Sequence, residues 1–318
     1  MYSIGIDLGG TNIAVGVVDE NYNIVGKAKI KTESSRGADA VIESMAAAAK
    51  MAVEDAGLTL KDITALGIGC PGSINTETGE VYYSNNLEWE HVFLTNEIRK
   101  YIDLPTYIDN DANSAAYGEF LAGAGKGSKN FIAITLGTGV GSGIIIDGKI
   151  ITGNTYAGGE LGHSVIVVDG AKCTCGRRGC YEAYASATGL IRQTKEKMLE
   201  CKDSIMWQLC HDDINNVNGR TAYDGQRKND KAADEVVNMY EKYVACGITN
   251  AMNIFEPDVI CLGGGVSKEG DNILTPVLKY VDAERFGRIN QRKTEIKIAE
   301  LGNDAGIIGA ACLYKLHK

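Results

Sequence analysis

Four side chains in a short segment have the types and the spacing of a metal site. They are His163, Cys173, Cys175 and Cys180. Three thiolates and one imidazole can complete the tetrahedral coordination that Zn²⁺ prefers. Gly176 and Gly179 lie among the thiols, where they let the backbone turn tightly enough to direct several sulfur atoms at one point. The pattern predicts a zinc ion that fixes this loop.

Two carboxylates flank the loop. Glu160 lies three residues before His163, and Glu182 lies two residues after Cys180. A closed zinc site does not need them, but a rigid loop could hold them for hydrogen bonds to a hydroxyl-rich ligand. His163 could serve both purposes, with one ring nitrogen on the metal and the other on the ligand. The alternative is a purely structural zinc loop with surface carboxylates, and the spacing alone leaves both open.

A glycine-containing turn near the N-terminus has groups that can hold phosphate oxygens. Alternating apolar residues predict two strands between residues 3 and 19, with the turn between them. The turn and its flanks contain Asp7, Gly9, Gly10, Thr11 and Asn12. Adjacent glycines allow a tight turn with exposed N–H groups, Thr11 adds a hydroxyl, and Asp7 offers a carboxylate to Mg²⁺ or its waters. Taken alone, these residues also fit an ordinary β-hairpin.

The same pattern occurs a second time. Residues 132–147 (IAITLGTGVGSGIIID) align without a gap on residues 4–19 (IGIDLGGTNIAVGVVD), and each copy reads as strand, turn, strand. The second turn contains Gly137, Thr138 and Gly139. An internal repeat of this kind predicts two similar halves that face one nucleotide.

A third group of glycines follows a predicted buried strand at residues 258–262. Glycine at the end of a strand permits close approach of a flat ligand such as a nucleoside, and Gly264 and Gly265 have that position. No G-x-G-x-x-G motif follows a strand and opens a helix, so the dinucleotide-binding fingerprint is excluded.

A general base is predicted at a junction between a strand and a helix. Residues 104–108 read as a strand and residues 114–121 as a helix, with Asn110 and Asp111 between them. A carboxylate is stable near a helix N-terminus, where Asp111 could accept a proton from a substrate hydroxyl. The alternative is a purely structural helix cap, a role that Asp109 or Asn110 could fill equally well. This stretch alone favours the structural reading.

Other periodic segments frame these motifs. Residues 38–57 predict a helix that ends at Gly57. Residues 63–70 predict a strand that leads into a turn at Gly72, whose backbone could touch a ligand. Residues 307–315 predict a final helix with small residues for close packing, which we expect to dock on the first half of the chain.

Length, charge and cysteine usage limit the possible functions. The chain has 318 residues, enough for two domains. We expect no signal peptide and no membrane span, since no segment approaches the ~20 apolar residues that a span needs. A net charge of −9 argues against nucleic acid as a partner. Clustered cysteines that look like ligands indicate a reducing, cytoplasmic environment.

The motifs together resemble the ROK family, which contains sugar kinases and repressors. The resemblance covers nearly the whole chain and is most similar to the glucokinase branch. The matching motifs are Asp7–Thr11 (DLGGT), Asn110–Asn113 (NDAN), Leu136–Gly141 (LGTGVG), Glu160–His163 (ELGH) and Cys173–Glu182 (CTCGRRGCYE). The last two are the most specific.

The resemblance implies a fold and a domain division. The fold is α/β, of the duplicated actin/hexokinase/Hsp70-like (ribonuclease H-like) type, with a cleft between two domains. Residues 1–112 with about 303–318 would form the smaller domain. Residues 113–302 would form the larger domain and carry the zinc loop. The family often forms dimers, so a homodimer is an open possibility.

The resemblance also implies a role for each motif. ATP with Mg²⁺ would phosphorylate the 6-hydroxyl of a hexose, with glucose as the expected substrate and Asp111 as general base. The sugar would be bound by Gly72, Asn110, Asp111, Glu160, His163 and Glu182. Structural zinc would be bound by His163, Cys173, Cys175 and Cys180. The nucleotide and its metal would contact Asp7, Gly9, Gly10, Thr11, Asn12, Gly137, Thr138, Gly139, Gly264 and Gly265. Ser73 departs from the proline that many relatives have after Gly72, a difference that could shift the loop over the sugar.

Three alternatives remain at this stage. The chain could phosphorylate another sugar, such as N-acetylglucosamine, N-acetylmannosamine, mannose or fructose. It could be a non-catalytic sugar sensor, although Asp111 argues against that. A DNA-binding repressor is disfavoured by the negative charge, and by a first strand that begins at about Tyr2 and leaves no room for a helix-turn-helix.

Overall fold

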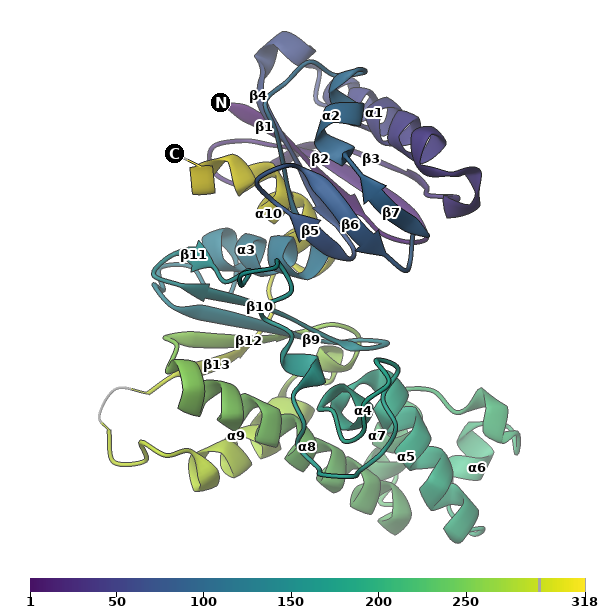
Figure 1. Ribbon diagram of the computed structural model, residues 1–318. Coiled ribbons are helices and arrows are strands. Elements are labelled where there is room, and N and C mark those ends of the chain that lie inside the picture. Colours follow the sequence, from purple (N-terminus) through teal and green to yellow (C-terminus); the bar gives the residue numbers. More distant parts are fainter. Residues whose placement is uncertain (291–292, 318) are drawn as a thin grey trace. The chain divides into compact units, whose positions relative to one another are not determined.

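Two sheets of the chain share one strand order, as the internal repeat predicts (Figure 1). The computed structural model describes residues 1–290 and 293–317. Within them, the first sheet has the order β3 (Ile24–Lys31), β2 (Asn12–Val18), β1 (Tyr2–Leu8), β4 (Ile63–Cys70) and β8 (Thr106–Asn110). The second has the order β11 (Lys149–Ile150), β10 (Val140–Ile146), β9 (Phe131–Leu136), β12 (Val259–Gly263) and β13 (Glu295–Ile298). The two aligned segments therefore form β1–β2 and β9–β10.

The remaining elements are a small sheet and ten helices among the described residues. The small sheet contains β5 (Ser73–Asn75), β6 (Glu80–Ser84) and β7 (Trp89–Val92). The helices are α1 (Ala38–Asp55), α2 (Leu94–Arg99), α3 (Asp111–Ala122), α4 (Glu182–Ala185), α5 (Ala187–Glu200), α6 (Met206–Leu209), α7 (Thr221–Arg227), α8 (Lys231–Phe255), α9 (Asp271–Glu284) and α10 (Ala305–Cys312). No helix of this described part is long and apolar enough to cross a membrane.

Contacts between residues divide the chain into two compact units. Unit 1 contains Met1–Ile132, Gly143–Gly159 and Glu300–Lys318, and unit 2 contains Ala133–Ser142 and Glu160–Ala299. Compactness does not show which segments fold independently, so the domain limits predicted from the sequence stay a prediction.

Most predicted elements occur with small shifts at their ends. Helix α1 ends as expected, because Gly57 has a φ of +68° and the N–H of Leu58 donates to Val53 O at 3.0 Å. This is the Schellman arrangement, which favours glycine. The predicted helix at 114–121 begins earlier, at Asp111, and the final helix runs over 305–312 and is followed by a 3-10 turn.

The first sheet is covered on both faces by helices (Figure 1). Alternate residues of β1, such as Ile4 and Ile6, pack with Val41 and Met45 of α1 in a fully buried cluster. The residues between them face α10, since side chains alternate along a strand. This alternation fixes the register of β1, because a slip by one residue would move its isoleucines out of the cluster.

Glycines let α10 lie directly on the backbone of its neighbours. A Cβ added to Gly5 of β1 would lie 1.9 Å from Ile307 O, and one added to Gly67 of β4 would lie 1.7 Å from Ala310 O. A Cβ on Gly309 of α10 would lie 1.7 Å from Ser114 O of α3. Helix α10 therefore joins β1 and β4 to α3, the helix that Asp111 begins, and it docks on the first half of the chain as predicted.

Adding one methyl group at this contact should destabilise the fold. We predict that Gly309→Ala lowers the free energy of unfolding by about 1–3 kcal/mol, because α3 and α10 would have to separate. The measurement is urea unfolding followed by circular dichroism.

The matched control is Gly219→Ala, whose added Cβ would meet its nearest atom, the Cβ of Ala187, at 3.8 Å. We expect this variant to resemble the wild type. A Gly309→Ala protein as stable as the control would contradict the account of the contact.

Candidate functional site

The carboxyl ends of β1, β4 and β8 meet at one edge of the first sheet. The strands are parallel, and their register pairs Asp7 with Gly69 and Gly69 with Asp109. Asp111 follows immediately, as the first residue of α3. In open α/β sheets, ligands bind outside the carboxyl ends of the strands. Asp7 and Asp111, predicted from separate motifs, therefore belong to one edge.

The junction before α3 has a defined hydrogen-bond pattern. The side-chain oxygen of Asn110 accepts from the N–H groups of Ala112 at 2.8 Å and Asn113 at 3.3 Å, so Asn110 caps the helix. Its Nδ2 donates to Gly72 O at 3.1 Å. Since Asn110 is the cap, Asp111 is not needed for that role. Its Oδ1 accepts a local hydrogen bond from the N–H of Ala112 at 2.9 Å.

Gly72 and Asp109 have structural roles of their own. Gly72 has a φ of +119°, and a Cβ on it would lie 2.1 Å from Tyr83 O, so close contact with β6 requires glycine there. Asp109 is buried and accepts from the N–H of Asn110 at 2.7 Å and from Asn113 Nδ2 at 2.8 Å. Burial raises its pKa to about 6, although the two hydrogen bonds act in the opposite direction and lower it. Asp109 thus supports the junction from inside.

Negative charge is costly at this edge. Burial and the nearby charge of Asp111 raise the pKa of Asp7 to about 6. Burial also raises the pKa of Asp111. The Asp7 carboxylate lies over the first turn of α10, where a Cβ on Gly306 would be 2.9 Å from Asp7 Cγ. A divalent cation bound here would stabilise the charged forms of Asp7 and Asp111, because it would neutralise both carboxylates.

The first glycine turn is held from the end of β3. The Thr32 hydroxyl donates to Gly9 O at 2.6 Å, and its N–H donates to Thr11 O at 3.0 Å. Neither Gly9 nor Gly10 has a positive φ, so the turn itself does not demand glycine. A Cβ on Gly10 would lie 3.3 Å from the Cβ of Asn86. The sequence does not predict the contacts of Thr32 and Asn86, because no local motif marks residues that reach this turn from other strands or loops.

The second glycine turn contacts Glu182. The N–H of Val140 donates to Glu182 Oε2 at 2.9 Å. A Cβ on Gly139 would lie 2.3 Å from the same oxygen, so a larger residue there would displace the Glu182 carboxylate. Glu182 Oε1 accepts from the Thr174 hydroxyl at 3.1 Å and lies 3.5 Å from the Cys173 thiol. Glu182 is therefore not an isolated surface carboxylate, and it connects the turn to the cysteine loop.

The late glycines differ from one another. Gly264 has a φ of +86°, and a Cβ on it would lie 2.5 Å from Leu136 O, so its close contact is with β9. Gly265 has nothing within 4 Å of an added Cβ. The space beside Gly265 is therefore open, whereas Gly264 is explained by packing alone.

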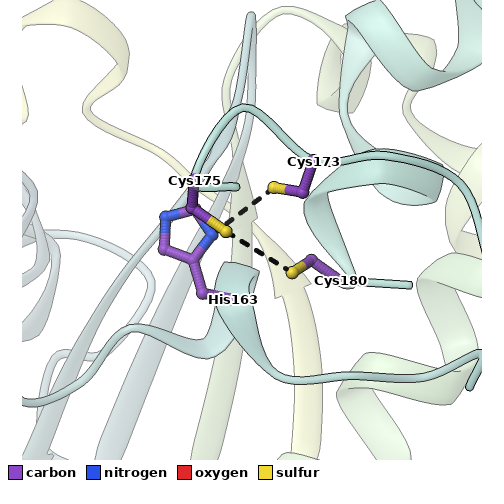
Figure 2. A group of neighbouring side chains, drawn as sticks. All are labelled: His163, Cys173, Cys175 and Cys180. Carbon is purple, nitrogen blue, oxygen red and sulfur yellow. Dashed lines mark hydrogen bonds between the residues drawn. The ribbon is translucent and has the colours of Figure 1, made fainter. Parts of the chain in front are cut away.

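The four predicted metal ligands lie together (Figure 2). Their donor atoms are all within 4.8 Å of one another. Cys175 Sγ and Cys180 Sγ are 3.7 Å apart, and Cys173 Sγ is 3.8 Å from His163 Nδ1. Tetrahedral bonds of about 2.3 Å to sulfur would separate two ligand sulfurs by about 3.8 Å. The donor types and their spacing therefore fit Zn²⁺, with Nδ1 of His163 facing the sulfurs.

The other predicted residues of the loop lie beside this cluster. Glu160 is exposed and immediately precedes the 3-10 turn Leu161–His163. The Arg177 side chain donates to His163 O at 3.2 Å. The structure thus brings His163, the cysteines and Glu182 together in unit 2, and Asp7, Gly72, Asn110 and Asp111 lie in unit 1.

Comparison with known proteins gives a consistent result. The ROK family model matches residues 3–317. A glucokinase from Halalkalibacterium halodurans is 37% identical over 313 residues, which cover 98% of this chain and 94% of that protein. A glucokinase from Streptomyces coelicolor is 35% identical over 315 residues, covering 98% and 97%.

A solved structure of a ROK family glucokinase from Streptomyces griseus, in complex with glucose and AMPPNP, is similar over the same extent. It is 34% identical, has a TM-score of 0.81, and the match covers 98% of this chain and 99% of that one. A xylose repressor from Bacillus subtilis is 30% identical over 255 residues, but the match covers 61% of its length. Because the family model and several relatives match across nearly the whole chain, this protein belongs to the ROK family.

Proposed function

We propose that the chain is an ATP-dependent glucokinase that phosphorylates the 6-hydroxyl of glucose. The full-length similarity to glucokinases, one of them solved with glucose and AMPPNP, supports this activity. The observation within the chain that carries it is the junction before α3. Asn110 caps the helix there, and Asp111 is left as a half-buried carboxylate with a raised pKa.

Asp111 is the proposed general base. Phosphoryl transfer depends on alignment and charge neutralisation more than on covalent chemistry. A carboxylate with a raised pKa is a stronger base than an exposed aspartate, and so takes a proton from a sugar hydroxyl more readily. Asn110 would bind the sugar beside it, with an orientation fixed by its bonds to the helix and to Gly72.

The glycine turns are the proposed phosphate sites. The N–H groups at Gly9–Asn12 and at Gly137–Gly139 would bind phosphate oxygens, and Gly265 would lie near the nucleoside. Asp7 would hold Mg²⁺, which supplies charge neutralisation to the phosphates when bound. The raised pKa of Asp7 fits this role, because a cation would stabilise its charged form.

The cysteine loop is the proposed zinc site, and it would orient the rest of the sugar pocket. Zn²⁺ would supply rigidity and no chemical step, because four protein ligands leave no open coordination position. Nδ1 of His163 lies toward the thiols, so its Nε2 would be the nitrogen available to a sugar hydroxyl. Glu160 and Glu182 would accept hydrogen bonds from neighbouring hydroxyls.

A panel of sugars tests the proposed function. ADP formation from Mg-ATP is measured with glucose, mannose, N-acetylglucosamine, N-acetylmannosamine and fructose. We expect glucose to give the highest kcat/KM. Activity confined to an acetylated sugar would keep the mechanism and replace the substrate. No ADP formation with any of the five, from folded protein, would contradict the kinase assignment.

The pH dependence of kcat/KM should reflect the protonation of the half-buried Asp7 carboxylate. We predict that kcat/KM for Mg-ATP falls as the pH drops through about 6, because Asp7 then becomes protonated and no longer attracts the cation. An exposed aspartate would lose its charge only near 3.8. The measurement is a series of initial rates at saturating sugar.

Asp7→Asn is the control for this profile. It should lower kcat/KM throughout and remove the inflection near 6, while any inflection due to Asp111 remains. A wild-type profile that stays flat until the pH approaches 3.8 would contradict the prediction.

Metal content should depend on the cysteine cluster. We predict that purified wild type holds one zinc ion per chain, and that Cys175→Ser loses most of it and melts at a lower temperature, because structural zinc contributes to folding. Elemental analysis and a thermal melt measure these effects. Cys201→Ser is the matched control, since Cys201 lies outside the cluster. Wild-type protein without zinc would overturn this assignment.

A further inference from the structure

The two glycine turns of the repeat are supported differently. The first is held by Thr32, which β3 (Ile24–Lys31) delivers to it. The corresponding strand of the second sheet, β11, has only two residues, Lys149 and Ile150. A strand this short does not carry a residue back to its turn. The second turn therefore needs support from another part of the chain.

That support comes from the segment that follows the cysteine loop. The N–H of Ala187 donates to Gly137 O at 2.8 Å, and the Thr188 hydroxyl donates to Thr138 O at 2.7 Å. From the same segment, Glu182 accepts the N–H of Val140 at 2.9 Å. Residues 182–188 thus hold the turn on both sides, and we call them the clamp segment.

The clamp segment is itself fixed by the cysteine loop. It begins two residues after Cys180, and its Glu182 carboxylate contacts Cys173 and Thr174 through Oε1. Tyr181, between Cys180 and Glu182, is fully buried, and its hydroxyl donates to Val244 O of α8 at 3.0 Å. A rigid cysteine loop on one side and α8 on the other therefore set the position of Glu182.

We propose that the clamp segment positions the second glycine turn for phosphate binding, with Thr188 as a positioning residue, and that zinc binding is thereby coupled to nucleotide binding. This inference rests on the proposed binding of ATP phosphates at that turn. If the metal loop opens, Glu182 loses its partners and the Val140 N–H loses its acceptor. Coupling of this kind is reciprocal in binding free energy, so bound nucleotide raises the affinity for zinc.

Thr188→Val tests the positioning role. Thr188 is exposed, so the substitution removes a hydroxyl without disturbing a core. Calorimetric titration of zinc-loaded protein with Mg-AMPPNP should show affinity reduced by about 3- to 10-fold, the usual effect of one lost hydrogen bond. Glucose affinity and zinc content should stay at wild-type values, and Thr188→Ser should restore nucleotide affinity.

Thr64→Val is the matched control. Thr64 is also exposed, and its hydroxyl donates to a backbone carbonyl, Tyr2 O, at 2.9 Å. Nucleotide affinity equal in Thr188→Val and Thr64→Val would overturn the positioning role, and so would zinc-loaded wild type that binds no AMPPNP. Nucleotide binding that responds to Thr188→Val without any glucose turnover would sustain this inference and refute the glucokinase assignment alone.

Hydrogen exchange tests the coupling without any activity measurement. Removal of zinc by a chelator should speed exchange of the Val140 amide, because its acceptor depends on the closed loop. In the reverse direction, AMPPNP without sugar should lower the fraction of zinc that a competing chromophoric chelator holds at equilibrium. Val140 exchange that is the same with and without zinc would refute the coupling.

Discussion

The site depends on the partial burial of two carboxylates at the carboxyl edge of one sheet. Removal from water makes ionised Asp7 and Asp111 expensive, and their pKa values rise in consequence. Close packing in the rest of the fold offsets this cost. The main contact is the packing of α10 on β1, β4 and α3, which glycines make possible. The cost is useful in the proposed reaction, because a destabilised carboxylate is a better proton acceptor and a stronger attractor for a cation.

The glycine turn in the second half of the repeat is supported by a different segment from the one that supports the turn in the first half. In the first half a full-length strand brings Thr32 to the glycine turn. In the second half β11 is too short, and the clamp segment beyond the cysteine loop supplies the hydrogen bonds. A zinc loop placed there would stabilise more than its own backbone. It would keep Glu182 where it meets both a candidate metal ligand and the turn.

Much of this could be predicted from the sequence, because the decisive patterns are local. The aligned hairpins indicated the shared strand order, and the spacing of His163 and the cysteines indicated the metal cluster. The contacts of Thr32 and Asn86 could not be predicted, since strand pairing and loops bring them to their turn from a distance. The reasons for glycine at positions 72 and 264 are also non-local, because each is packed against another strand. Asn110 is the residue that caps α3, and the composition of the segment does not distinguish it from Asp109 as a cap, because the choice depends on backbone geometry.

In the proposed reaction, Asp111 accepts the proton during phosphoryl transfer. The most direct measurement is a rapid-quench single turnover of wild type and Asp111→Asn with Mg-ATP and glucose, together with their glucose affinity. We expect the variant to bind glucose about as tightly as wild type, because the Asn side chain can still accept from the N–H of Ala112. We expect its chemical step to slow by about 10²- to 10⁴-fold. A chemical step at nearly the wild-type rate would contradict the role of Asp111 as general base.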